Sequence, residues 1–197
     1  MSHTDKKGLL LVLMQPPPTL EDEFNAWYDT EHIPERLAVP GFETGIRYVC
    51  ISGAPKYMAI YDVVNPDVLS SPDYLRVSFD NASPWTKRVT SRVQVYRSAG
   101  AQVFPGNLIT RRAPRILLLR FRGLPESAGS MIVAGMRSSF EKRPETLQVR
   151  VFAQEAESGI DFLGMVEASS DTSTQFDAAA FGDCIQALDL VNSYAAY

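Results

Sequence analysis

The chain has 197 residues, of which 45% are hydrophobic and 21% charged, so it carries enough apolar surface for a sizeable core. A formal net charge of -4 without a block of Lys and Arg argues against a nucleic-acid partner. No segment approaches the roughly 18 to 20 apolar residues of a membrane-spanning helix, and the polar start followed by a short apolar run is unlike a secretory signal. We therefore expect a cytoplasmic protein with no membrane partner.

The first half of the chain predicts the element order βαββαβ. The apolar run at 8–15, which three prolines follow, indicates a strand covered on both faces. A helix is expected over 20–38, with a kink or early stop near Ile33 because Pro34 lacks a backbone donor. The later elements of this half are strands at 42–52 and 57–64 that form a hairpin, helical segments at 66–79 and 83–91, and a strand at 92–101. This order is the ferredoxin-like arrangement.

The second half repeats the same order, which predicts an internal duplication. Its expected elements are strands at 116–121, 146–154, 162–169 and 188–195 and helices at 126–141 and 174–187. The best local match aligns Arg47 with Arg150 on the second strand of each half. The predicted division is therefore a repeat over 8–104, a linker over 105–114 that is rich in turn-forming residues, and a degenerate repeat over 115–197.

The fold class follows from the need to cover two sheets. A four-stranded sheet with helices on one face leaves the other face bare, and several strands here are apolar on both faces. Two such sheets in one chain can cover each other. We therefore expect an α+β protein in which two ferredoxin-like halves with antiparallel sheets form one α/β barrel, an intrachain pseudo-dimer whose interior is partly filled and partly available to a ligand.

The segment 24–34 of the first helix carries the most informative pattern. At about 100° per residue, one broad apolar face forms, with Glu31 near its middle and His32 at its edge. The other members of this face are Leu20, Phe24, Trp27, Tyr28, Pro34 and Ala38. A carboxylate there must find a partner or take up a proton, and a histidine beside it could move a proton near neutral pH. His32 and Glu31 are therefore the candidate catalytic residues.

Structural explanations of the same residues stay open. Glu31 could form a salt bridge with an arginine of the sheet such as Arg47, and His32 could merely form a hydrogen bond at a helix end. Trp27 and Tyr28 could be core residues, because aromatic side chains at helical spacing pack the core more often than they cage a ligand.

Other chemistry finds little support in the sequence. The chain has two histidines, and His3 lies near the start, so no multi-histidine metal site can form within one chain. The isolated Cys50 and Cys184 favour neither a disulfide nor a metal site. Glycine-rich phosphate loops and nucleophile elbows are absent. Haem binding through His32 would rest on a single residue. We expect neither a metal nor a cofactor.

The segment from Glu23 to Leu37, with its Trp-Tyr pair and Glu-His-x-Pro sequence, resembles the signature of the EthD-like branch of the dimeric α+β barrel superfamily. A Pro-Gly-Phe turn at 40–42 leads into the second strand, and Ser-Pro-Trp-Thr at 83–86 adds to the likeness. The helix around 129–142 has neither pair, so the resemblance there concerns the fold alone. One site and one half that serves as a wall are expected.

The superfamily includes cofactor-independent lyases, isomerases, dehydratases and monooxygenases, so the resemblance does not fix the reaction. Carried over by position, it makes His32 the acid or base, with Glu31, Tyr28, Trp27, Arg47 and Tyr48 as supporting or substrate-binding groups. The first hypothesis is a cofactor-free lyase or isomerase that acts on a small cyclic or aromatic oxygenated metabolite. The alternatives are a non-catalytic binding or accessory protein and a filled, purely structural barrel. A homodimer through sheet edges or helices stays open.

Overall fold

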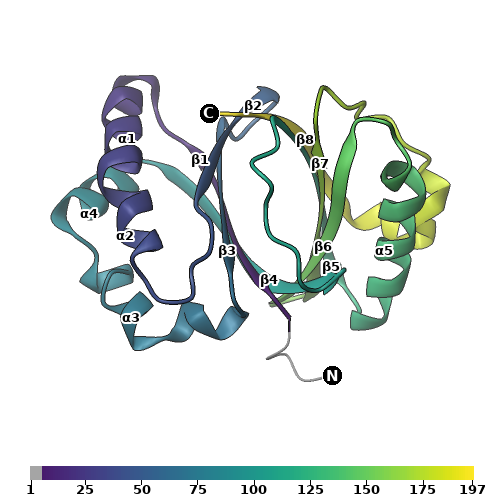
Figure 1. The fold of residues 1–197 in the computed structure, drawn as a ribbon, viewed down its shortest axis with the longest axis horizontal. Helices are drawn as coiled ribbons and strands as arrows, with labels where there is room; N and C mark the ends of the chain where they lie inside the picture. The colour runs from purple at the N-terminus through teal and green to yellow at the C-terminus, as the bar shows by residue number, and fades with distance from the viewer. Residues whose placement is uncertain (1–5) are drawn as a thin grey trace.

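The computed structural model describes residues 6–197, which form a closed barrel of eight antiparallel strands with helices on its outside (Figure 1). The strands are β1 (Gly8–Gln15), β2 (Ile46–Ser52), β3 (Tyr57–Val63), β4 (Gln94–Phe104), β5 (Arg115–Leu124), β6 (Thr146–Ala156), β7 (Gly159–Ala168) and β8 (Leu188–Ala196). Their order around the barrel is β1-β3-β2-β8-β5-β7-β6-β4. The predicted α+β barrel is confirmed.

Both halves have the strand order of a ferredoxin-like sheet. The first half runs β2-β3-β1-β4 and the second β6-β7-β5-β8, so the first strand of each half lies between its third and fourth. The halves join at two seams, where β2 pairs with β8 and β4 pairs with β6. Each bare sheet face is covered by the other sheet, as expected. The residue boundaries of the two repeats stay a prediction.

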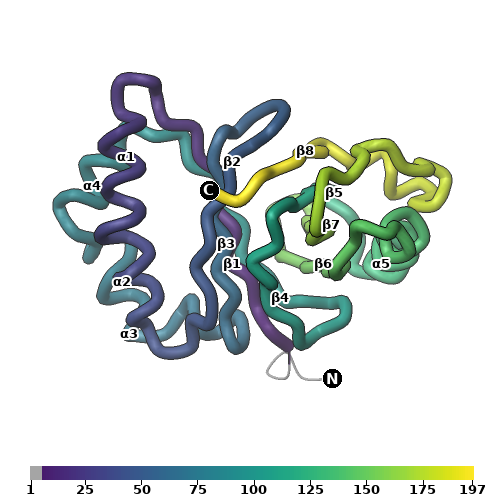
Figure 2. The backbone as a smooth tube through the Cα atoms, turned by 45° about the horizontal axis from the view of Figure 1, so that its top comes forward, coloured from purple at the N-terminus to yellow at the C-terminus, as the bar shows by residue number. Residues whose placement is uncertain are grey.

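The helices flank the barrel on two opposite sides, those of the first half on one side and α5 on the other (Figures 1 and 2). The helical elements of the first half are a 3-10 turn (Pro18–Leu20), α1 (Glu21–Trp27), a π-helical turn (Tyr28–His32), α2 (Ile33–Leu37), a 3-10 turn (Pro66–Ser70), α3 (Pro72–Leu75), a 3-10 turn (Phe79–Asn81) and α4 (Pro84–Thr90). Those of the second half are a 3-10 turn (Glu126–Ala128), α5 (Gly129–Met136), a π-helical turn (Arg137–Glu141) and a 3-10 segment (Ala178–Ala187). Within residues 6–197, no helix is long and apolar enough to cross a membrane.

The barrel interior is packed with side chains. One apolar cluster takes members from strands of both halves, for example Leu11, Tyr48, Leu118 and Met165, each at most 1% exposed. An eight-stranded barrel is just wide enough for side chains to fill. The middle of the barrel is therefore filled, and a cavity of about 320 Å³, lined by Leu13 of β1, Tyr96 of β4 and Leu190 of β8, opens at one end of the interior. Two further clusters lie outside the barrel, each between one half of the sheet and its own helices.

The linker over 105–114 runs across the barrel and is tied to a buried ion cluster (Figure 1). Arg150 is fully buried, and its guanidinium lies 2.6 Å from Asp62 and 2.9 Å from Glu167. The linker binds both carboxylates through backbone N–H groups, that of Thr110 to Asp62 at 2.9 Å and that of Arg111 to Glu167 at 2.7 Å. The buried charges thus fix the connection between the halves.

The predicted correspondence of Arg47 and Arg150 is wrong. Arg150 points into the barrel, whereas Arg47 points outward and forms an ion pair with Asp29 of the first-half helix layer at 2.6 Å. Successive residues of a strand face opposite sides, so an alignment that is off by one residue exchanges the two faces. The two halves are therefore alike in the order of their strands, and the two arginines are not equivalent positions.

The predicted helix over 174–187 is replaced by a shorter 3-10 segment, Ala178–Ala187, which is interrupted at Gly182 (φ 51°). Within it, Phe181 is fully buried and stacks on Phe121 of β5 with ring centroids 5.2 Å apart. The ring of Phe181 also lies where a Cβ atom at Gly135 of α5 would be, 2.5 Å away. Tertiary packing of one aromatic ring therefore overrides the local helical pattern.

Candidate functional site

The segment that carries the motif contains a widened helical turn. Pro34 has no N–H to donate to the carbonyl four residues before it, and in the preceding turn the N–H of Ile33 donates to the carbonyl of Tyr28, five residues back. The helix then continues to Leu37, so of the kink or early stop expected near Ile33 the early stop does not occur, and the irregularity there is the π-helical turn. A π-helical turn of this kind is frequent at functional sites. Here it presents Tyr28 and His32 to one cavity.

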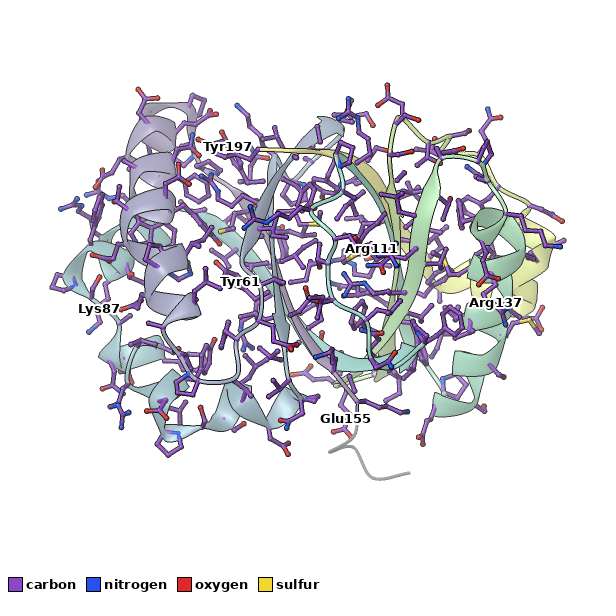
Figure 3. All side chains as sticks on the ribbon, in the orientation of Figure 1. Tyr61, Lys87, Arg111, Arg137, Glu155 and Tyr197 are labelled. Atoms are coloured by element: carbon purple, nitrogen blue, oxygen red, sulfur yellow. The ribbon has the colours of Figure 1, made fainter. Side chains whose placement is uncertain are left out.

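The cavity lies between these helices and the outer face of the first-half sheet and has a volume of about 240 Å³. Its helical wall includes Trp27, Tyr28 and His32, and the sheet contributes Tyr61 of β3, which Figure 3 labels between the helix layer and the barrel. Apolar side chains of β1 form part of the floor. The pocket predicted around the motif is thus present, but on the outside of the barrel.

Aromatic rings surround the imidazole of His32. Its centroid lies 4.3 Å from the Trp27 ring, 5.0 Å from Tyr28 and 6.5 Å from Tyr61. Loss of hydration in this surrounding lowers the pKa of His32 to about 3, and the charge of nearby Arg36 lowers the pKa further in the same direction. The side chain as a whole is half-buried, but its Nδ1 is completely buried. His32 is therefore neutral at physiological pH.

Three buried polar atoms on the cavity wall have no hydrogen-bond partner among residues 6–197: the hydroxyls of Tyr28 and Tyr61 and Nδ1 of His32. Burial raises the pKa of both tyrosines, and the neighbouring Tyr28 raises that of Tyr61 further, although their hydroxyls form no hydrogen bond of acceptable geometry. Both hydroxyls thus keep their protons. Because unpaired buried polar groups are costly, this cluster suits a ligand that supplies the missing partners.

Glu31 belongs to a different network. Its carboxylate accepts hydrogen bonds from the hydroxyls of Ser83 and Thr86, the latter at 3.2 Å, and Trp27 Nε1 donates to the Thr86 hydroxyl at 3.0 Å. These bonds tie α4 to the π-helical turn. Glu31 is half-buried and does not line the cavity, so it positions the wall and makes no hydrogen bond to His32.

The structure separates Arg47 and Tyr48 from the cavity. Arg47 pairs with Asp29 and stacks on the rings of Tyr28, at 4.7 Å, and Tyr197, at 3.8 Å, without lining the cavity. The expected ion pair of Glu31 with Arg47 does not form. Tyr48 packs inside the barrel. Of the predicted site residues, Trp27, Tyr28 and His32 are therefore the three that come together at the cavity.

Tyr61, Arg36 and Thr86 line the cavity and were not identified from the sequence. A signal for Tyr61 existed, because it alternates along its strand with Ile60, which faces the barrel interior. Arg36 is four residues beyond His32 on the same helix, a spacing that places both on one face. No sequence signal pointed to Thr86 as a cavity residue, since its contact with the helix depends on how α4 packs.

The second half does not reproduce this cavity. The space between α5 and its sheet is filled by phenylalanine rings, with Phe176 and Phe181 5.4 Å apart and Phe140 and Phe176 5.6 Å apart. A separate groove of about 730 Å³ lies between α5 and β4, β6 and β7, and none of its lining side chains has an unpaired buried polar atom. Among residues 6–197, no group of three or more His, Cys, Asp and Glu side chains could hold a metal ion.

The fold is a closed α+β barrel whose two ferredoxin-like halves lie in one chain, with a cavity between the helices and the sheet of the first half. No family model matches the chain, and a search of curated proteins finds no match either.

Among solved structures, the chain is similar to an anthrone oxidase-like protein, with a TM-score of 0.68, 10% identity, and coverage of 98% of this chain and 92% of that one. It is also similar to a candidate chlorite dismutase (TM-score 0.58, 10% identity, 98% and 95% covered) and to a candidate monooxygenase from Lactobacillus acidophilus (TM-score 0.54, 8% identity, 98% and 93% covered). At such low identity the likeness concerns the fold.

Proposed function

We propose that the chain is a cofactor-independent enzyme that catalyses proton transfer, of lyase or isomerase type, on a small cyclic or aromatic oxygenated metabolite. The observation that carries this proposal is the cluster of three unpaired buried polar atoms on Tyr28, Tyr61 and His32. Two hydroxyl donors and a neutral imidazole in a cavity lined by aromatic rings are the groups that such a reaction needs.

In the proposed step, His32 accepts a proton from a carbon next to a carbonyl. The C–H bond breaks, an N–H bond forms, and the electron pair moves to the carbonyl oxygen, which the hydroxyls of Tyr28 and Tyr61 stabilise by hydrogen bonds. Return of the proton to another carbon gives an isomer, and departure of a neighbouring group gives a lyase product. The pKa of about 3 describes the imidazole without an anion beside it; the developing negative charge raises it.

Further support comes from sequence and fold together. The Trp-Tyr and Glu-His-x-Pro pattern resembles the EthD-like signature, and the shared strand order with a π-helical turn after the main helix in each half supports an origin by duplication. The structures with the same fold include an oxidase-like protein and a candidate monooxygenase, which supports a role in small-molecule chemistry.

A second function, a binding or accessory protein for the same kind of metabolite, is favoured by the low basicity of His32. An imidazole with a pKa of about 3 is a weak general base, because catalysis is most efficient when the pKa lies near the working pH. In that function the three polar atoms would only hold the ligand.

One experiment separates the two functions. A panel of cyclic ketones, lactones and phenols is tested for binding by calorimetry and for exchange of substrate C–H protons with heavy water by NMR, with wild type and His32→Gln. If wild type exchanges substrate protons and His32→Gln binds the same compound without exchange, the result supports the enzymatic function. Binding without exchange in either protein supports the binding function. Absence of binding across the panel contradicts both. Tyr96→Phe, at an exposed tyrosine outside the cavity, serves as the control.

A further inference from the structure

The charged residues that line the cavity are all cations. They are Arg36, Lys87 and Arg97, and within residues 6–197 no Asp or Glu side chain lines the cavity. The groove against α5 differs, since its lining contains two cations and two carboxylates, Lys6 with Arg137 and Glu126 with Glu155. A positive lining is thus a property of the cavity and is not shared by the larger groove.

The contacts of these three cations show which of their positive charges are not paired with a carboxylate. Arg36 is buried, donates to the carbonyl of Val77 at 2.8 Å and lies 3.4 Å from the carboxylate of Glu35, which partly compensates its charge. Lys87 donates to a backbone carbonyl at 2.6 Å, and Arg97 to a tyrosine hydroxyl at 3.4 Å. Neither Lys87 nor Arg97 forms an ion pair with any residue in 6–197. Two positive charges at the cavity are therefore uncompensated.

The cavity has a buried end and an exposed end. Tyr28 and Tyr61 are at most 1% exposed, whereas Lys87 and Arg97 are exposed and Phe79, which also lines the cavity, is 64% exposed. Figure 3 shows Lys87 on the outer side of the helix layer and Tyr61 on the side of the barrel. The hydrogen-bonding groups without partners thus lie inside, and the cations without carboxylate partners lie at the mouth.

We propose that the ligand is an aromatic or cyclic carboxylate that also carries a hydroxyl or carbonyl oxygen. The ring lies among the aromatic side chains, the oxygen reaches Tyr28 and Tyr61, and the carboxylate binds Arg97 and Lys87 at the mouth. An arginine guanidinium matches the geometry of a carboxylate, and the lysine adds a point charge. This inference rests on the proposed function and names its substrate class.

The test compares matched acid and amide probes, which share the ring and the hydroxyl and differ in charge. The pairs are para-hydroxybenzoate with para-hydroxybenzamide, and a hydroxynaphthoate with its amide. Binding is measured by calorimetry for wild type, for Lys87→Gln with Arg97→Gln, and for a control in which Arg122→Gln and Lys142→Gln remove the same charge outside the cavity lining. Thermal melts establish that each variant is folded.

Wild type should bind the acid more tightly than the amide. The double variant at the mouth should lose about tenfold in affinity for the acid, because each exposed charge pair contributes up to roughly fivefold. Affinity for the amide should not change, and the control should behave as wild type.

Equal binding of acid and amide by wild type, or an unchanged preference in the mouth variant, overturns the inference. If the amide still binds and its affinity falls in Tyr28→Phe, the proposed function stands while the carboxylate assignment fails. If no probe binds, both are overturned.

Discussion

His32 should couple folding to pH, because its environment resists protonation. The pKa of His32 falls from 6.5 to about 3 in the folded protein, chiefly through burial, while the unfolded chain keeps the ordinary value. Below the unfolded pKa the unfolded state binds a proton that the folded state rejects, so stability falls as pH is lowered towards the folded pKa. Below the unfolded pKa of 6.5, each pH unit lowers the free energy of unfolding by about 1.4 kcal/mol. The change from about pH 7 to about pH 4.5 covers about two such units and therefore removes at most about 2.5 kcal/mol.

The assay is urea unfolding at both pH values for wild type and His32→Gln. Glutamine does not titrate, so the contributions of the other acidic and basic groups cancel when the two pH dependences are subtracted. Wild type should lose up to about 2.5 kcal/mol more than the variant. Equal losses in the two proteins would show that the imidazole is hydrated in the folded state and would refute the buried, neutral assignment.

Three further substitutions test the packing around the site and the barrel. Arg150→Met should cost about 3 to 5 kcal/mol in urea unfolding, because Asp62 and Glu167 would remain buried without their cation. Thr86→Val should cost about 1 to 3 kcal/mol in the same assay, since the buried indole N–H of Trp27 loses its acceptor and the Glu31 carboxylate loses one of its two hydroxyl donors. Gly135→Ala should lower the thermal midpoint, with a cost of about 1 to 3 kcal/mol, because the new methyl group meets an aromatic ring at 2.5 Å.

Each substitution has a matched control. Arg122→Met removes an exposed arginine and should cost less than about 1 kcal/mol. Ser91→Ala and Ser130→Ala, at exposed positions after α4 and in α5, should change stability by less than about 0.5 kcal/mol. A loss at Arg150 or Thr86 no larger than that of its control would contradict the network described for that residue. A neutral Gly135→Ala would mean that the aromatic ring can move aside.

The strands and the closure of the barrel could be predicted from the sequence, because both depend on which residues are apolar. The β1 segment was predicted at the bounds the structure has, since it is apolar on both faces. The pattern of apolar residues gave wrong predictions where a contact with an element distant in the sequence determines the local structure. The helix expected over 174–187 gave way to the packing of Phe181, and the aligned arginines, Arg47 and Arg150, face opposite sides of the sheet.

The site was predictable in part for the same reason. Trp27, Tyr28 and His32 share a helix, so helical spacing is enough to bring them to one cavity. The partner of Glu31 could not be predicted, because α4 follows more than 50 residues later and supplies both hydroxyls. The pocket lies outside the barrel because side chains from seven strands together fill the middle of the interior. Their combined volume cannot be predicted from the pattern of any single segment.

Ligand binding in the cavity of the first half is tested most directly by a crystal structure of the protein with para-hydroxybenzoate or a hydroxynaphthoate. We expect the ligand in the cavity between the helices and β3, with an oxygen within hydrogen-bond distance of the Tyr28 and Tyr61 hydroxyls and its ring beside His32. Ligand found in the groove against α5 while the cavity stays closed by its own side chains would contradict this expectation.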